Sequence, residues 1–198
     1  MSYIIVGLGN PGEEYENTRH NVGRMALMSF QKEQDFPEWK LNSKINALIS
    51  EKNLPNIGKV TLILPEAFMN NSGKSLTTVI TSKKKAKELV VVHDDLDLPQ
   101  GKVKISFNKS AGGHRGVQNI VNKIKTEEFV RVRIGISPET KKGIKKPQGE
   151  KAVLDFILGK LKPEEEKQFK KEFKTISKAL LILLGEGWSK AASVYGSL

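Results

Sequence analysis

The chain has 198 residues, which suits one domain with a real core, and its 38% hydrophobic and 28% charged residues are typical of a soluble globular protein. It contains no cysteine, which excludes disulfides, a thiol nucleophile and cysteine-based metal centres, and fits a reducing cytoplasm. The sequence shows neither a signal-peptide pattern nor an apolar run long enough to cross a bilayer, so we expect no contact with a membrane.

The net charge of +11 is concentrated in one quarter of the sequence. Residues 101–151 contain 13 Lys and Arg against 4 Glu, whereas the rest of the chain contains 20 basic and 18 acidic residues. A basic patch of this kind suits a polyanion, most often a nucleic acid. A solvated, lysine-rich surface is the alternative that charge alone leaves open.

Strand-like and helix-like segments alternate along the chain. In chain order, the apolar patterns predict a strand over Tyr3–Val6, a helix from Val22 to about Gln34, strands over Ile45–Ser50 and Val60–Leu64, a helix from Asn70 or Asn71 to about Ser82 and a central strand over Leu89–Val92. A strand over Val103–Phe107, a helix over Gly116–Lys125, a strand over Phe129–Ile136, a basic loop over Gly143–Gly149, a short helix over Ala152–Leu158 and an amphipathic helix from Pro163 to Gly185 follow. This order predicts a single α/β domain over residues 1–198. Its twisted, mixed and mostly parallel sheet would carry helices on both faces.

The first strand continues into GLGNPG, which has the G-x-G-x-x-G spacing of a dinucleotide-binding turn. That interpretation requires a helix that opens within the turn and a later strand that ends in an acidic residue. Instead, three glutamates follow Pro11, and the next helical pattern starts only near Val22. We therefore expect no nucleotide cofactor. The glycines allow a tight exit from the strand that presents Asn10 at its carboxyl end, unless they form a plain turn.

Three histidines offer chemistry near neutral pH: His20, His93 and His114. His20 lies in the polar stretch NTRHN, and Asp94 follows the predicted central strand. A carboxylate there could accept a hydrogen bond from an imidazole and fix its tautomer, which suits general-base activation of water. Alternatively, His20 is a solvated loop residue, His93 a packed residue and His114 a turn cap. No His, Asp and Glu spacing resembles a metal-ligand set, so we expect no metal.

Five stretches resemble, in order, the motifs of bacterial-type peptidyl-tRNA hydrolases: GLGNPGEEYENTRHNVG, PEAFMNNSGKS, VVHDDLDLPQGKVK, SAGGHRGVQNI and FVRVRIGI. The resemblance spans nearly the whole chain, and the first motif is long and specific. It implies an enzyme that cleaves the ester between a peptide and the 3′ ribose of tRNA, and so frees tRNA from chains that left the ribosome early. It also implies a cytoplasmic monomer that needs no cofactor and whose partner is peptidyl-tRNA.

The resemblance implies a role for each matching residue. His20 would be the general base on water, and Asp94 would orient it and raise its basicity. Asn10 would help to distinguish N-blocked peptidyl-tRNA from aminoacyl-tRNA with a free amine. The remaining substrate-binding residues would be Tyr15, Phe68, Met69, Asn70, His114 and Arg115.

The resemblance also implies a basic clamp for a tRNA phosphate at Lys104 and Arg133, and a mobile lid over residues 137–149. Two positions depart from the family pattern. Arg115 stands where the family usually has the Asn of G-G-H-N-G, and it has donors but no acceptor. Ser106 stands where relatives often have a further lysine. A second hypothesis is an RNA-binding relative without catalysis, which Arg115 alone favours, because a pure binder would not need the other site residues.

Overall fold

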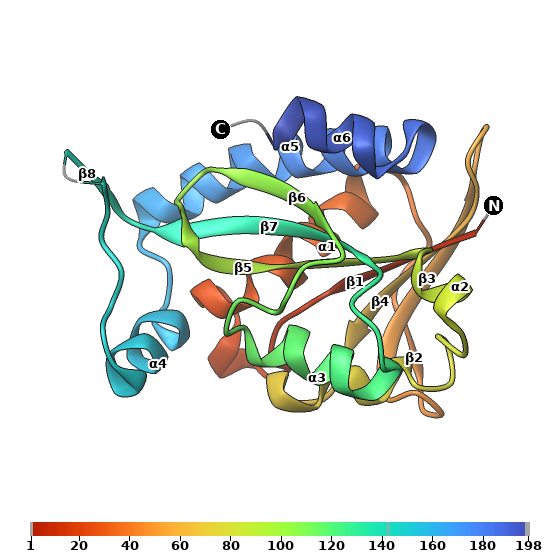
Figure 1. The fold of residues 1–198 in the computed structure, drawn as a ribbon, viewed down its shortest axis with the longest axis horizontal. Coiled ribbons are helices and arrows are strands. Elements are labelled where there is room, and N and C mark those ends of the chain that lie inside the picture. Colours follow the sequence, from red (N-terminus) through yellow and green to blue (C-terminus); the bar gives the residue numbers. More distant parts are fainter. Residues whose placement is uncertain (1, 142, 197–198) are drawn as a thin grey trace.

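A seven-stranded mixed sheet forms the middle layer of the protein (Figure 1). The structure is a computed structural model, and it describes residues 2–141 and 143–196. In spatial order the strands are β2 (Lys40–Asn42), β3 (Ala47–Leu54), β4 (Gly58–Pro65), β1 (Ser2–Gly7), β5 (Leu89–Pro99), β7 (Val130–Ser137) and β6 (Val103–Phe107). The central strands β4, β1, β5 and β7 are mutually parallel, and the pairs at both edges are antiparallel. The predicted fold class is confirmed.

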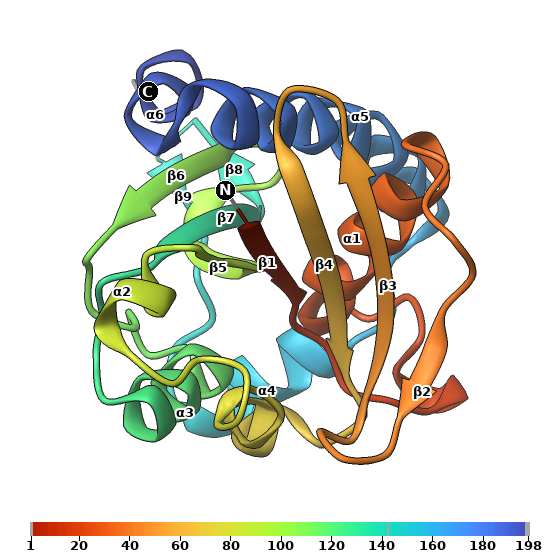
Figure 2. The same ribbon diagram turned by 90° about the vertical axis from the view of Figure 1, so that its right-hand side faces the viewer.

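Helices cover both faces of the sheet (Figure 2). One face carries α1 (Val22–Glu33), α5 (Pro163–Glu186) and α6 (Trp188–Tyr195), and the other carries the 3₁₀ helix η3 (Met69–Leu76), α2 (Lys83–Ala86) and α3 (Arg115–Ile124). Successive residues of β1 alternate between the two cores: Ile5 packs on the α1 and α5 side, whereas Ile4 and Val6 pack on the η3 and α3 side. Burial on both faces explains why this strand is a continuous apolar run.

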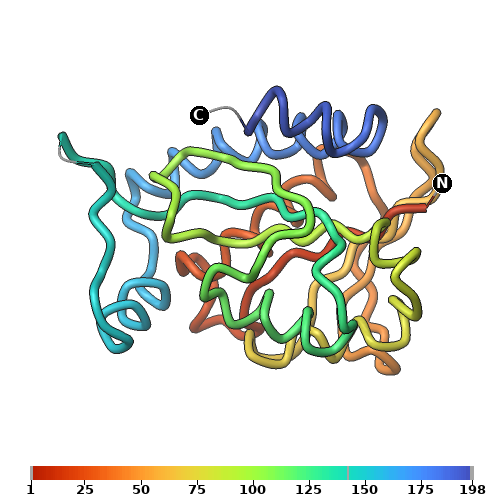
Figure 3. The backbone as a smooth tube through the Cα atoms, viewed as in Figure 1, coloured from red at the N-terminus to blue at the C-terminus, as the bar shows by residue number. Residues whose placement is uncertain are grey.

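A small hairpin and a short helix extend from the end of β7. Strands β8 (Glu139–Thr140) and β9 (Gly143–Ile144) form the hairpin, which projects beyond the sheet, and α4 (Glu150–Leu158) leads back to it (Figures 1 and 3). The hairpin lies within residues 137–149, the segment expected to form a lid, of which Lys142 is outside the described residues. Its role as a lid stays a prediction. No described helix combines the length and the apolar character that a membrane crossing requires.

The helix predicted from Asn70 or Asn71 to Ser82 is wrong. The chain forms the 3₁₀ helix η3 up to Leu76, and α2 starts separately at Lys83. One cause is visible at Gly73, whose N–H donates to the Asn119 side chain at 2.8 Å instead of to a carbonyl of its own helix. An added Cβ on Gly73 would lie 2.6 Å from the Asn119 carbonyl oxygen, so η3 is pressed against α3 too closely for a regular α-helix with side chains there.

Strand β5 is longer than the apolar run that predicts it. The sequence predicts a strand that ends at Val92, but pairing with β7 continues through Asp94 and Asp95 and, after an irregularity, to Pro99. Backbone hydrogen bonds set this length, and they do not require apolar side chains. Helix α6 was also not predicted; its Trp188 ring stacks on Phe107 of β6 at 5.0 Å, a contact between segments far apart in sequence.

Gly23 lets the first turn of α1 lie directly on the sheet. A Cβ at this position would lie 2.3 Å from the Val92 carbonyl oxygen and 2.9 Å from that of Leu8. The Leu8 carbonyl accepts the N–H of Arg24 at 2.8 Å, and the Leu8 N–H donates to the Val92 carbonyl at 3.0 Å, so backbone bonds hold this approach. Neither Leu8, which follows β1, nor Val92 of β5 can move away without breaking one of these hydrogen bonds.

We expect Gly23→Ala to destabilise the protein by about 2 kcal/mol, because a methyl group there overlaps backbone atoms. Thermal unfolding would then show a Tm about 4–8 °C lower. Gly185→Ala in α5 is the matched control, since nothing lies within 4 Å of its added Cβ. Helix propensity predicts a small stabilisation for the control. Equal Tm values for wild type and Gly23→Ala would contradict the prediction.

Glu172 of α5 is an acid buried away from the strand ends. It is 7% exposed, and neither carboxylate oxygen has a hydrogen-bond partner of good geometry among the described residues. Burial raises the pKa of Glu172 to about 7, and the nearby Gln168 amide lowers it only in part. The native state therefore keeps a proton that the unfolded chain releases near pH 4.5. Stability is lost as the pH rises between these two values.

We expect Glu172→Gln to remove this loss, since an amide has no charge to bury. The difference in unfolding free energy between variant and wild type should grow from pH 5 to pH 8 by about 1 kcal/mol and then level off. Thermal unfolding measured across that pH range checks it. Parallel curves of Tm against pH for the two proteins would show that Glu172 does not titrate in this way.

Candidate active site

A cavity of about 540 Å³ opens at the edge of the sheet where β1 and β5 present their carboxyl ends. Parallel α/β sheets commonly bind ligands at this edge. One side of the cavity is polar and contains Asn10, His20, Asp94 and His114. The α4 side is apolar, and its residues are Val153, Leu154, Ile157 and Leu158. The cavity thus combines titratable groups with a surface suited to apolar ligand groups.

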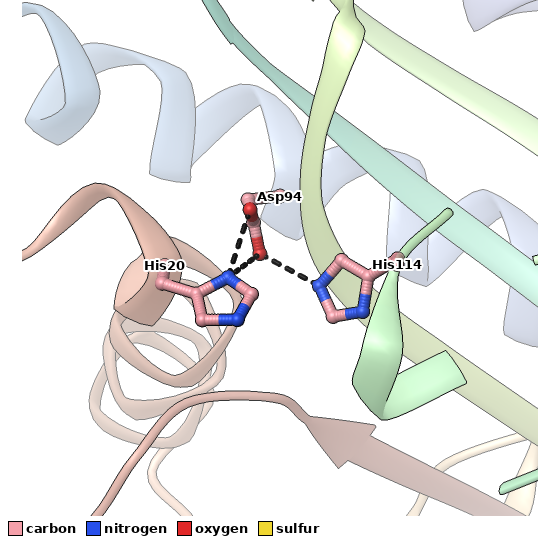
Figure 4. Close-up of side chains that lie close together, drawn as sticks. All are labelled: His20, Asp94 and His114. Atoms are coloured by element: carbon pink, nitrogen blue, oxygen red, sulfur yellow. Dashed lines mark hydrogen bonds and ion pairs between the residues drawn. The ribbon is translucent and has the colours of Figure 1, made fainter. Parts of the chain in front are cut away.

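Asp94 accepts hydrogen bonds from two imidazoles (Figure 4). Nδ1 of His20 lies 3.0 Å from both carboxylate oxygens, and Nε2 of His114 lies 2.8 Å from Oδ1. Burial by itself would raise the pKa of Asp94, but the charges of His20 and His114 and their hydrogen bonds outweigh it and hold the pKa well below its ordinary value. Asp94 is therefore an anion, although it is only 3% exposed.

The hydrogen bonds determine which ring nitrogens carry protons. Nδ1 of His114 caps α3 by accepting the N–H of Val117 at 3.2 Å, so its Nε2 carries the proton donated to Asp94. His20 donates to Asp94 through Nδ1, so that in the neutral imidazole Nε2 holds the lone pair; Nε2 has no hydrogen-bond partner among the described residues. His20 lines the cavity and is thus arranged to accept a proton from a molecule bound there.

The side chain of Asn10 is oriented by the protein backbone. Its Oδ1 accepts the backbone N–H of Met69 at 2.8 Å. The backbone N–H of Asn10 donates to Oδ1 of Asn21 at 2.8 Å, and the backbone carbonyl of Asn10 accepts from Nδ2 of Asn21 at 2.9 Å. Gly9 allows this packing, because an added Cβ would lie 2.7 Å from Cβ of Arg24. The two donors of the Asn10 NH₂ group and the second lone pair of its Oδ1 remain for a ligand in the cavity.

No helix opens within the GLGNPG turn. The turn is followed by two short 3₁₀ helices, η1 (Glu13–Tyr15) and η2 (Arg19–Asn21), and α1 begins only at Val22. The helix N-terminus that a dinucleotide site requires is therefore absent from this turn. The turn instead places Asn10 beside the cavity.

Arg19 and Asn21, which flank His20, were not identified as site residues from the sequence. The Arg19 guanidinium forms a bidentate ion pair with Glu165 at 2.7 and 2.9 Å. It also donates to the carbonyls of Phe156 and Gly159, both at 3.3 Å, and so joins η2 to the end of α4. The only indication in the sequence is a polar stretch placed directly before an apolar helix.

The other predicted residues are distributed over several places. Phe68, Met69, Asn70 and Arg115 line the cavity, and the side chain of Arg115 forms an ion pair with Glu150. Tyr15 packs edge-on against Phe68, with ring centroids 6.0 Å apart, but does not line the cavity. Lys104 and Arg133 lie outside the cavity, directly opposite each other on β6 and β7.

His93 is buried behind Asp94. Its Nδ1 lies 2.7 Å from the Asp94 carbonyl, and its ring centroid lies 4.7 Å from that of His114. Burial first, and then the charges of His114 and Arg131, hold the pKa of His93 well below its ordinary value. His93 is thus a packed, neutral residue, the second of the two interpretations that its sequence context allows.

His20, Asp94 and His114, shown in Figure 4, are residue types that commonly bind metal ions. Potential ligand atoms of His20, Asp94 and His114 lie within 4.8 Å of one another, a proximity that sequence spacing did not indicate because three different elements contribute them. In the observed hydrogen-bond network, however, the two facing nitrogens carry protons donated to the carboxylate. A metal ion would have to displace both. The expectation of no metal stays a prediction.

Comparison with known proteins identifies the family. A family model described as peptidyl-tRNA hydrolase matches residues 4–197. The peptidyl-tRNA hydrolase of Thermodesulfovibrio yellowstonii is 33% identical over 98% of this chain and 99% of its own, and that of Listeria welshimeri is 41% identical over 79% of each. The crystal structure of the Acinetobacter baumannii enzyme is 29% identical, with a TM-score of 0.84 over 96% of this chain and 92% of that one. The chain belongs to the peptidyl-tRNA hydrolase family and is a hydrolase of peptidyl-tRNA.

Proposed function

We propose that His20 is the general base of this hydrolysis and that Asp94 orients it. The observation that carries the proposal is the His20–Asp94 hydrogen bond of 3.0 Å, which fixes the proton on Nδ1 and leaves Nε2 free in the cavity. Nε2 accepts a proton from water while the water oxygen attacks the ester carbonyl. When the intermediate collapses, the bond to the ribose oxygen breaks and the imidazolium returns the proton to that oxygen. The Asp94 anion stabilises the imidazolium in between.

Asn10 supports selection of substrates whose amine is blocked. Because its Oδ1 is bound to the Met69 N–H, Asn10 is held in one orientation and can offer the donors of its NH₂ group to the cavity. The carbonyl oxygen of a peptide bond accepts such a donor. The ammonium group of an aminoacyl-tRNA has only donors itself, so it cannot accept a hydrogen bond from this NH₂ group. We infer that Asn10 discriminates between the two by this mismatch.

The tRNA contacts that we propose lie at Lys104 and Arg133, on the antiparallel pair β6 and β7. Backbone phosphate contacts by such residues weaken strongly as salt increases and do not depend on base sequence. We also infer that the protein acts as a monomer and in the cytoplasm, where its substrate arises during translation. Tyr15, Phe68, Met69, Asn70 and His114 are proposed to hold the peptide and the acceptor end.

We expect His20→Ala to lower kcat by about a hundred- to ten-thousand-fold, the usual contribution of a general base, while deacylated tRNA binds within about threefold of wild type. Release of tRNA from N-acetyl-aminoacyl-tRNA measures the rate, and fluorescence anisotropy measures binding. Full turnover in this variant would show that another group activates water. No turnover in the wild-type protein would favour an RNA-binding protein without catalysis.

We expect Arg115→Asn to keep kcat/KM within about tenfold of wild type, which corresponds to about 1.4 kcal/mol. Its partner Glu150 is 75% exposed and Arg115 is 58% exposed, and such surface ion pairs contribute little. Glu150→Gln is the control, because it breaks the same pair and leaves Arg115 in place. A much larger loss in Arg115→Asn alone would assign Arg115 a direct contact with the substrate.

A further inference from the structure

Arg133, one of the two residues of the proposed phosphate clamp, is held by a neighbouring carboxylate. Its Nε–H donates to Oδ2 of Asp95 at 2.5 Å, and the two side chains are only 18% and 11% exposed. The terminal Nη groups of Arg133 have no hydrogen-bond partner among the described residues. Asp95 thus binds the inner edge of the guanidinium and leaves its outer donors available.

The Asp95 carboxylate is itself fixed in place. Its second oxygen, Oδ1, accepts the backbone N–H of Asp97 at 2.7 Å. Asp95 lies opposite Gly135 of β7, where an added Cβ would lie 2.0 Å from the carbonyl oxygen of Pro99. The two strands therefore approach each other closely at this point. A carboxylate bound at both oxygens can orient the group that it contacts.

Asp95 also compensates a second arginine. Arg131 lies two residues before Arg133, on the same face of β7, and is 4% exposed. Among the described residues it forms no hydrogen bond or ion pair. Burial and the charge of Arg133 lower the pKa of Arg131, while the charges of Asp95 and Glu127 oppose the shift. Without Asp95, less negative charge would offset the positive charges of the neighbouring Arg131 and Arg133.

We propose that Asp95 is a positioning residue for substrate binding, which holds Arg133 through Nε so that its Nη groups bind a tRNA phosphate. The inference rests on the proposed clamp and deepens it. Asp95 follows Asp94 directly in β5, so one buried strand carries both the carboxylate that orients the base and the carboxylate that orients the clamp. The Cα atoms of Asp94 and Asp95 are therefore about 4 Å apart.

A purely electrostatic role for Asp95 predicts the opposite result. If Asp95 only neutralised Arg133, its removal would increase the positive charge near the substrate and strengthen binding to tRNA. If Asp95 positions Arg133, its removal weakens binding in spite of the added charge. The direction of the change therefore separates the two roles.

We expect Asp95→Ala to raise KM for N-acetyl-aminoacyl-tRNA by about three- to tenfold, with kcat changed less than about twofold, and to weaken anisotropy-detected binding of deacylated tRNA to the same extent. Glu127→Ala is the control, because it removes an equal charge near Arg131 but no hydrogen bond to Arg133. Its KM should stay within about twofold of wild type. Tighter tRNA binding by Asp95→Ala, or an equal loss in the control, would overturn the proposal.

Substitutions at Arg133 keep the test decisive if Asp95→Ala unfolds. Arg133→Lys keeps the charge but lacks the Nε and Nη fork, so it should lose as much binding as Asp95→Ala. If Arg133→Lys binds like wild type, Asp95 has no fork to position and the inference fails. If Arg133→Ala also binds like wild type, the clamp itself fails. With both single variants folded, Asp95→Ala should add no further loss to Arg133→Lys.

Discussion

The charge of Asp94 is the constraint on which the site depends. A carboxylate that is 3% exposed is stable as an anion only where donors surround it, and here the donors are two imidazole N–H groups. The same bonds determine the tautomers of the neutral His20 and His114 rings, and with them which nitrogen of His20 is left without a partner among the described residues. Loss of one partner of a buried charge costs about 3–5 kcal/mol. Stability and chemistry therefore select the same arrangement.

Close backbone packing brings these groups together. His20 precedes α1, and α1 can lie on β1 and β5 only because Gly23 has no side chain. On the other face, His114 caps α3 through Nδ1 and meets Asp94 through Nε2. Asp94 thus lies between two helix starts that approach the sheet edge from opposite faces. Either helix start, if displaced by an ångström, would break a hydrogen bond to the carboxylate.

The sequence predicts the parts of this structure that depend on local pattern. Apolar runs mark β1 and the first half of β5, and the NTRHN stretch marks His20. It does not predict the extension of β5 to Pro99, because polar residues pair there through backbone bonds with β7. The contact of Arg19 with Glu165 joins residues 146 positions apart and leaves no local pattern. Charge patterning likewise located a basic quarter without showing that Arg133 is bound to Asp95.

The arrangement also bears on a conflict, within the proposed mechanism, between the base and a polyanionic substrate. An exposed carboxylate next to the scissile ester would repel the phosphates of tRNA, yet the imidazole needs a carboxylate to stabilise its charged form. Asp94 borders the cavity but is only 3% exposed, and the rings of His20 and His114 both donate to its carboxylate. The basic residues lie one and two strands away, on β7 and β6. In the proposed mechanism, the carboxylate that assists proton transfer and the basic residues that bind phosphate therefore lie on separate strands of one sheet, so that their charges need not cancel each other.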